Sequence, residues 1–202
     1  MFEKAMKWLN VLVLLIELNI LWLLGLILGL FFIGLVPSTS AMIRLFEKSD
    51  LFTGYYSYVG VFKLYCHYYV ETIKTCKWRV LLFPIVVSTI YLELLFIQND
   101  QMMRAVFQWP LLILLAYVLL VLLNSILIDD RSTEIWWRKA VFALMSPLVL
   151  IGESIICILL ILTFAIISLA YHWFFFIAIS LFLYTTYRCL YNGYQKKGLL
   201  KI

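Results

Sequence analysis

Three carboxylates lie within or close to long apolar stretches of the sequence: Glu17, Glu93 and Glu153. An ionisable residue at membrane depth costs roughly 2.5–3.5 kcal/mol on insertion scales, so each is a candidate functional residue. Glu153 is the strongest of the three, because it lies in the middle of its stretch between two small residues. The alternative is structural: a protonated or hydrogen-bonded carboxyl group that fixes helix packing. Glu17 and Glu93 lie nearer to segment ends, where a side chain can reach the interface.

Two amides, Asn19 and Asn124, also fall within apolar stretches. Hydrogen bonds between membrane helices contribute about 0.6 kcal/mol on average, so such residues hold helices together more often than they bind ligands. A carrier would instead arrange polar groups around a cavity at the membrane midplane. The candidate intramembrane polar residues are Glu17, Asn19, Asn124 and Glu153.

No residue spacing typical of catalysis or metal binding occurs. His67 and Glu71 form a single i, i+4 pair on a charged face, and His172 stands alone. There is no Gly-rich phosphate loop, no G-x-S-x-G and no H-E-x-x-H motif. We therefore expect a protein that is not an enzyme and has no metal and no cofactor. The cysteines form no C-x-x-C motif and are expected to be reduced packing residues: Cys66, Cys76, Cys157 and Cys189.

The composition indicates the fold class. Hydrophobic residues make up 65% of the 202 residues and charged residues 13%, whereas a soluble domain has roughly 45–50% apolar and about 25% charged residues. A membrane β-barrel would require short alternating strands, but this chain has long unbroken runs of Leu, Ile and Phe. The sequence therefore predicts an all-α, polytopic membrane helix bundle that forms a single membrane domain.

Five apolar stretches are long enough to cross a bilayer, which needs about 20 residues. Pro37 is expected to end the first stretch, and only Tyr171 and His172 separate the last two. Six of the seven tryptophans lie near segment ends, as expected for residues that prefer the headgroup level. The predicted helices cover about 9–36, 80–97, 105–128, 141–170 and 173–187.

Basic residues predict the orientation. With five spans, thirteen of the 16 Lys and Arg residues fall on one side of the membrane. The positive-inside rule then places the N-terminus outside and the C-terminus in the cytoplasm. Lys4 and Lys7 lie on the outer side and oppose this orientation, a conflict that a partly re-entrant first segment would relax. No long basic tract suggests nucleic acid as a partner.

The region between the first two spans contains an expected amphipathic helix at about 55–74. Its apolar residues recur at i+3/i+4 spacing, and Lys63, His67, Glu71 and Lys74 occupy the opposite face. Such a helix lies on the cytoplasmic membrane surface or docks on a partner. Tyr-rich patches are favoured at protein interfaces. The candidate docking residues are Tyr55, Tyr58, Phe62, Tyr65 and Tyr69.

A further set of sequence features comprises Asn19, Leu21-Trp22, the segment Gly-Leu-Val-Pro-Ser-Thr-Ser-Ala at 34–41, and Phe52, Tyr56 and Phe62-Lys63. Together they resemble the YesL-like family of bacterial membrane proteins, which is classed as a domain of unknown function. The resemblance is firmest over about residues 15–80, and the later helices match in number and spacing. Family members more often have Ala at the position of Ser38.

The resemblance implies an accessory role in sugar uptake, because such proteins are frequently encoded near carbohydrate ABC importers. It supplies no catalytic residues. One hypothesis is a non-enzymatic membrane subunit that associates with the permease of such an importer. The alternative is a small solute carrier or substrate-capture protein that acts through its own helices. Both place the chain in the bacterial cell membrane, with membrane lipids as partners.

Overall fold

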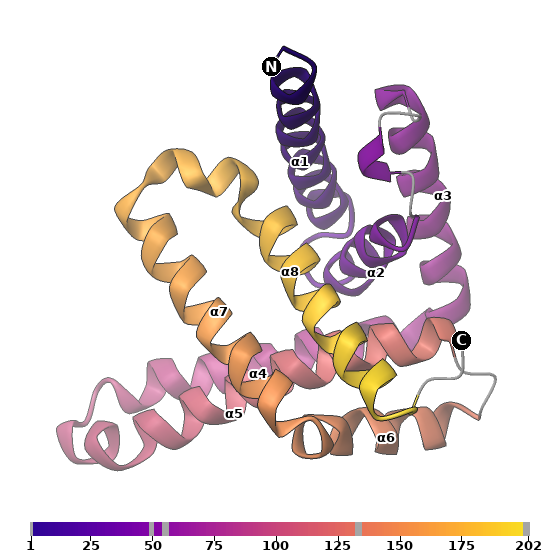
Figure 1. Ribbon diagram of the computed structural model, residues 1–202. Helices are drawn as coiled ribbons and strands as arrows, with labels where there is room; N and C mark the ends of the chain where they lie inside the picture. The colour runs from indigo at the N-terminus through magenta and orange to yellow at the C-terminus, as the bar shows by residue number, and fades with distance from the viewer. Residues whose placement is uncertain (1, 49–50, 54–56, 132–134, 200–202) are drawn as a thin grey trace.

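The computed structural model describes residues 2–48, 51–53, 57–131 and 135–199. All elements in these ranges are helical, which confirms the predicted all-α class (Figure 1). The elements are α1 (Phe2–Leu28), α2 (Leu35–Phe46), η1 (Leu51–Thr53), α3 (Tyr58–Cys76), η2 (Lys77–Leu81), α4 (Leu82–Ile97), α5 (Gln101–Arg131), α6 (Trp136–Val149), α7 (Ile151–Ala170), η3 (His172–Phe174) and α8 (Phe175–Lys196).

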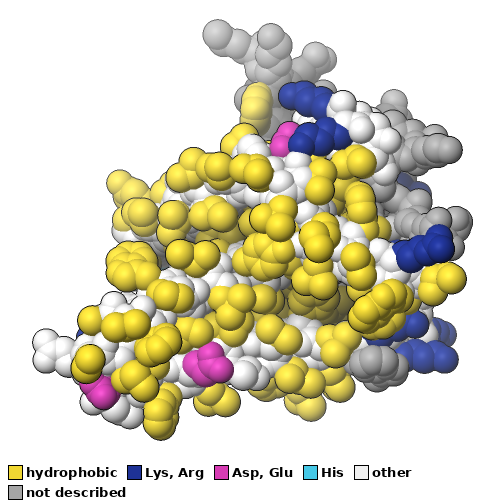
Figure 2. Space-filling view, turned by 90° about the horizontal axis from the view of Figure 1, so that it is seen from below, with side chains coloured by type: hydrophobic (Ala, Val, Ile, Leu, Met, Phe, Trp, Pro, Cys, Tyr) yellow, Lys and Arg dark blue, Asp and Glu magenta, His cyan; other side chains and the backbone are white. Residues whose placement is uncertain are grey.

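Five helical segments of the described chain are long and apolar enough to cross a bilayer, so the protein is a helical membrane bundle. Large apolar side chains are exposed along all of them, as lipid contact requires. Figure 2 shows hydrophobic side chains over much of one face, with Lys and Arg gathered towards one edge. The five segments are Trp8–Leu28, Arg79–Ile97, Gln101–Asp129, Ile151–Ala170 and His172–Lys196.

The first apolar stretch is not one helix to Val36, as the sequence suggested. It ends at Leu28, reverses direction over 29–34 and continues as α2. Leu30 and Phe31 adopt positive φ angles of 51° and 62°, which breaks the helix. Pro37 does not end the helix; it is the third residue of α2, where a missing N–H costs no helical hydrogen bond.

The backbone of this reversal is closed on itself. All six N–H groups from Gly29 to Gly34 donate to backbone carbonyl oxygens at 2.7–3.1 Å. A membrane-embedded turn needs such satisfaction because lipid offers no hydrogen-bond partner. The side chains of Leu28, Leu30, Phe31 and Phe32 are all exposed, so the reversal presents an apolar tip.

The predicted fourth helix, 141–170, is divided at Leu150, whose φ and ψ of −104° and 51° are not helical. Pro147 lacks the N–H that would reach the carbonyl oxygen of Ala143, and Ser146 Oγ donates to that oxygen instead at 2.9 Å. The break also frees the carbonyl oxygen of Pro147, which accepts from Ser154 Oγ at 3.0 Å. Two serines therefore allow α6 and α7 to separate without unsatisfied carbonyl groups at these two positions.

The short helix α2 lies at the centre of the packing. Ten of its 12 residues are buried, and it contacts α1, α3, α5 and α8. Figure 1 shows α2 enclosed between α1, α3 and α8, with the α4–α5 hairpin crossing below. The packing around α2 brings the first half of the chain into contact with the last helix.

Candidate functional site

A pocket of about 500 Å³ lies between α2, α3, α4, α5 and α6. Its volume falls within the range of roughly 300–1,000 Å³ that is typical of small-molecule sites. Apolar side chains form most of its wall: Val36, Leu82, Phe83, Val86, Leu114, Val118, Val121, Ile126, Ala140, Ala143 and Leu144. The chain thus folds an apolar cavity from five helices that follow one another in the sequence, α2 to α6.

Charged residues also line this pocket. Lys139 Nζ on α6 lies 3.0 Å from Asp129 Oδ1 on α5 and also donates to the backbone oxygen of Asp129 at 3.1 Å. The guanidinium group of Arg79 lies over the ring of Trp136, 5.0 Å from its centroid. Arg44 extends from the end of α2. The lining therefore includes three cations and one described carboxylate.

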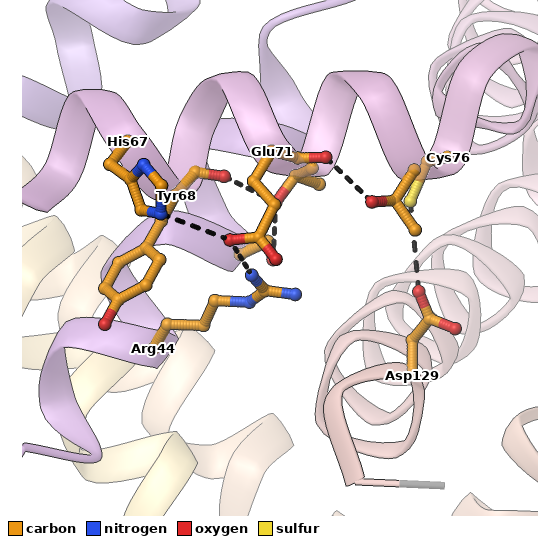
Figure 3. Close-up of polar contacts among 9 residues, drawn as sticks. Arg44, His67, Tyr68, Glu71, Cys76 and Asp129 are labelled. Carbon is orange, nitrogen blue, oxygen red and sulfur yellow. Dashed lines mark hydrogen bonds and ion pairs between the residues drawn. The ribbon is translucent and has the colours of Figure 1, made fainter. Parts of the chain in front are cut away.

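Arg44 is held in place from α3 (Figure 3). Its Nη1 atom lies 3.0 Å from Glu71 Oε2, and its guanidinium carbon lies 5.7 Å from the centroid of the Tyr68 ring. His67 Nε2 lies 3.9 Å from the same carboxylate oxygen. Glu71, which the sequence analysis placed on the charged face of the helix, therefore joins α3 to α2.

Cys76 lines the pocket beside Asp129, with 3.9 Å between Sγ and Oδ2 (Figure 3). Burial and, to a lesser degree, the negative charge of Asp129 raise the pKa of the Cys76 thiol. Both factors disfavour the thiolate, which is the reactive form. Cys76 is therefore a protonated, weakly reactive wall residue at neutral pH.

None of the four candidate intramembrane polar residues lines this pocket. Asn19 is buried and donates through Nδ2 to the backbone oxygen of Phe175 at 2.9 Å, joining α1 to α8. Asn124 accepts a hydrogen bond of 2.6 Å from Tyr194 Oη, joining α5 to α8. Glu17 Oε2 is buried without a hydrogen-bond partner among the described residues.

The sequence predicts Glu153 in the middle of a helix, but the residue lies in the first turn of α7, because Leu150 breaks the preceding segment. Its side chain packs against Gly193 of α8. A Cβ atom at Gly193 would lie 2.7 Å from Glu153 Cγ. Glu153 therefore lies at a close contact between α7 and α8.

The aromatic residues of α3 at positions 58, 62, 65 and 69 lie on one face of the helix but differ in exposure along its length. Tyr58 and Phe62 are 51% and 47% exposed. Tyr65 is buried, and Tyr69 donates to the backbone oxygen of Gly25 at 2.9 Å, so both pack inward. Tyr55 lies outside the described residues. The stripe expected to face a partner is thus exposed only in its N-terminal part.

Sequence reasoning did not find the pocket. Arg44, Arg79 and Lys139 entered the prediction only as basic residues that set the orientation. These three side chains come together because α2, η2 and α6 pack around one pocket, and no short sequence pattern predicts that packing. No group of three or more potential metal-ligating side chains occurs in the described ranges.

Residues 15–94 match the model of a family described as a protein of unknown function, DUF624. This is the domain family to which YesL-like proteins belong, so the expected resemblance is confirmed over this region. The matched region includes α2, α3, and the residues Arg44 and Arg79. Neither the curated proteins nor the solved structures that were searched give a match.

Proposed function

We propose that this protein is a non-enzymatic accessory subunit that associates with a carbohydrate ABC-type importer in the bacterial cell membrane. In this proposal the N-terminus lies outside and the C-terminus in the cytoplasm. The family resemblance motivates the importer as partner. The basic residues of α2, η2 and α6 line one pocket, which agrees with a common cytoplasmic side for the first and third loops.

The observation that carries the proposal is the exposed aromatic pair on α3. Tyr58 and Phe62 are one helical turn apart, and Val59 beside them is 63% exposed. α3 is not one of the five segments that are long and apolar enough to span a membrane, and in the proposal it lies on the cytoplasmic side, where a partner can reach this surface. The inward-facing Tyr69 fixes the helix to α1. A rigid helix with exposed aromatic side chains is well suited to protein docking.

The wall of the pocket favours the accessory role over sugar transport by the chain itself. A sugar needs many hydrogen-bond partners, and a buried polar group without one costs free energy. The pocket wall is mainly apolar, and the four candidate intramembrane polar residues lie elsewhere.

The experiment is co-purification of the importer with the wild-type protein and with a Tyr58→Leu, Phe62→Leu variant, at equal abundance in the membrane. Leucine keeps the apolar area but removes the aromatic shape and the hydroxyl group. Central aromatic residues of interfaces contribute about 2 kcal/mol or more each, so recovery of the importer should fall strongly. Undiminished recovery of the importer with this variant would show that α3 is not the docking element.

The matched control is a Lys63→Ala, Lys74→Ala variant, which changes two exposed residues of the same helix. It should recover the importer as well as the wild type. Equal losses in both variants would mean that any change on α3 disturbs the complex, and would contradict a specific aromatic contact.

A further inference from the structure

We propose that the pocket between α2 and α6 binds one acyl chain of an anionic phospholipid, with the lipid phosphate near Arg44, Arg79 and Lys139. This inference goes beyond the accessory role and does not depend on it. It rests on the wall, the charges and the openings of the pocket.

The wall is suited to a hydrocarbon chain because its hydroxyl groups are already engaged within the protein. Thr72 Oγ1 lies 3.2 Å from Ser40 Oγ and 2.8 Å from the backbone oxygen of Tyr68. Ser125 Oγ donates to the backbone oxygen of Leu122 at 2.8 Å. A polar solute would find few open partners there, whereas an acyl chain needs none.

The charges lining the pocket favour an anion. Asp129 is the one described carboxylate in the lining, and it is bound to Lys139. Arg44 is paired with Glu71. Arg79 lies over Trp136, and no carboxylate whose side chain is described lies within ion-pair distance of it. The lining thus keeps a net positive charge, and a phosphate oxygen would match Arg79 in particular.

The apolar wall continues onto the outer surface of the bundle. Leu82, Val86, Leu114 and Leu144 line the pocket and are also exposed. In a membrane these residues meet the surrounding lipid, so a chain can enter sideways without crossing water. Basic pockets between membrane helices on the cytoplasmic side are known to bind anionic lipid headgroups.

The test uses the full-length protein in nanodiscs made from equal amounts of phosphatidylglycerol and phosphatidylcholine. After extraction in mild detergent, the lipids that remain bound are measured by mass spectrometry. The wild type should retain phosphatidylglycerol in clear excess. In an Arg79→Gln, Lys139→Gln variant this excess should fall about fivefold for each charge removed. Equal retention of both lipids by the wild type would overturn the proposal.

Two further variants separate the parts of the site. Lys63→Gln, Lys74→Gln removes the same charge from the exposed face of α3 and should keep the wild-type excess. Ala140→Trp fills the pocket from α6 and should lower bound lipid of both kinds. Equal loss of the excess in the α3 variant would show a non-specific charge effect and contradict the site.

A last measurement distinguishes a lipid from a free anion. Inorganic phosphate at millimolar concentration, added to the wild type with its retained lipid, should not release phosphatidylglycerol, because the acyl chain contributes most of the binding. Full release by phosphate would show an anion site without a lipid chain and would overturn the proposal. If Ala140→Trp does not fold, the Arg79→Gln, Lys139→Gln variant still tests the site, because its phosphatidylglycerol excess should fall.

Discussion

Tyr194 Oη donates a 2.6 Å hydrogen bond to Asn124 Oδ1, and both side chains are completely buried. The bond joins α8 to α5. Asn124 Nδ2 is occupied as well, by the backbone oxygen of Leu120 at 2.8 Å. Both polar atoms of the Asn124 amide therefore have hydrogen-bond partners, and the residue holds α8 against α5.

The variant Tyr194→Phe should destabilise the fold moderately. Interhelical hydrogen bonds in membrane proteins contribute about 0.6 kcal/mol on average and up to about 1.7 kcal/mol. We expect a loss near the upper value, because Asn124 Oδ1 would be left buried without a partner. The measurement is reversible unfolding in mixed detergent. Tyr171→Phe, at an exposed position, should leave the stability unchanged, and an equal loss there would contradict the role of the bond.

Gly34 is required where the chain reverses between α1 and α2. A Cβ atom at Gly34 would lie 2.5 Å from the backbone oxygen of Gly25 and 2.8 Å from Leu26 Cα. These are backbone atoms and cannot move aside, so Gly34→Ala should strongly lower the yield of folded protein. Gly152→Ala meets no atom within 4 Å and should be tolerated. The measurement is the monodisperse fraction in detergent, and tolerance of Gly34→Ala would contradict the close approach.

The proposed orientation predicts the activity of reporters fused at two sites. A reporter at Asn99, between α4 and α5, should be active only if it works outside the cell. A reporter after Ile202 should be active only if it works in the cytoplasm. A cytoplasmic reporter that is active at Asn99 would rule out the five-span orientation with an external N-terminus.

Cys76 should react slowly with a maleimide at neutral pH and faster as the pH rises. The thiolate reacts, and burial together with the Asp129 carboxylate raises the pKa of this thiol. Asp129→Asn removes the negative charge and should lower the pKa, so labelling at a fixed pH should accelerate. Site-resolved mass spectrometry measures the rate at Cys76. An unchanged rate in the variant would show that Asp129 does not influence the thiol.

The sequence was sufficient to predict the class of the fold. Hydropathy and length identify membrane helices because each membrane helix must satisfy its own backbone hydrogen bonds and present apolar side chains to lipid along its length. The family resemblance through Asn19 and the segment 34–41 was also recognisable. Each of these features depends on residues that are close together in the chain, so it can be recognised in the sequence alone.

The breaks within apolar stretches were not predictable in this way. The residues of 29–34 are as apolar as those of a helix, and the reversal depends on positive φ at Leu30 and Phe31 and on bonds to α1. The break at Leu150 likewise depends on Ser146 and Ser154, which capture the freed carbonyl oxygens. Hydropathy averages over such positions, so it merges two helices into one.

The candidate site was not predictable because its parts meet only in the tertiary structure. Tyr65 and Tyr69 share the periodicity of Tyr58 and Phe62, yet only the latter two are well exposed. Which part of this aromatic face is covered depends on α2 and on Gly25 of α1, which belong to other helices. The same holds for Arg44 and Lys139, which come from distant segments.

The closed backbone of the reversal at 29–34 has a consequence for biosynthesis. A chain leaving the ribosome presents α1 and α2 before any later helix exists. Because the turn satisfies its own N–H groups, α1 and α2 can pack against each other before a later helix supplies any hydrogen-bond partner. The buried face of α2 is then ready as a template on which α3, α5 and α8 assemble as they emerge.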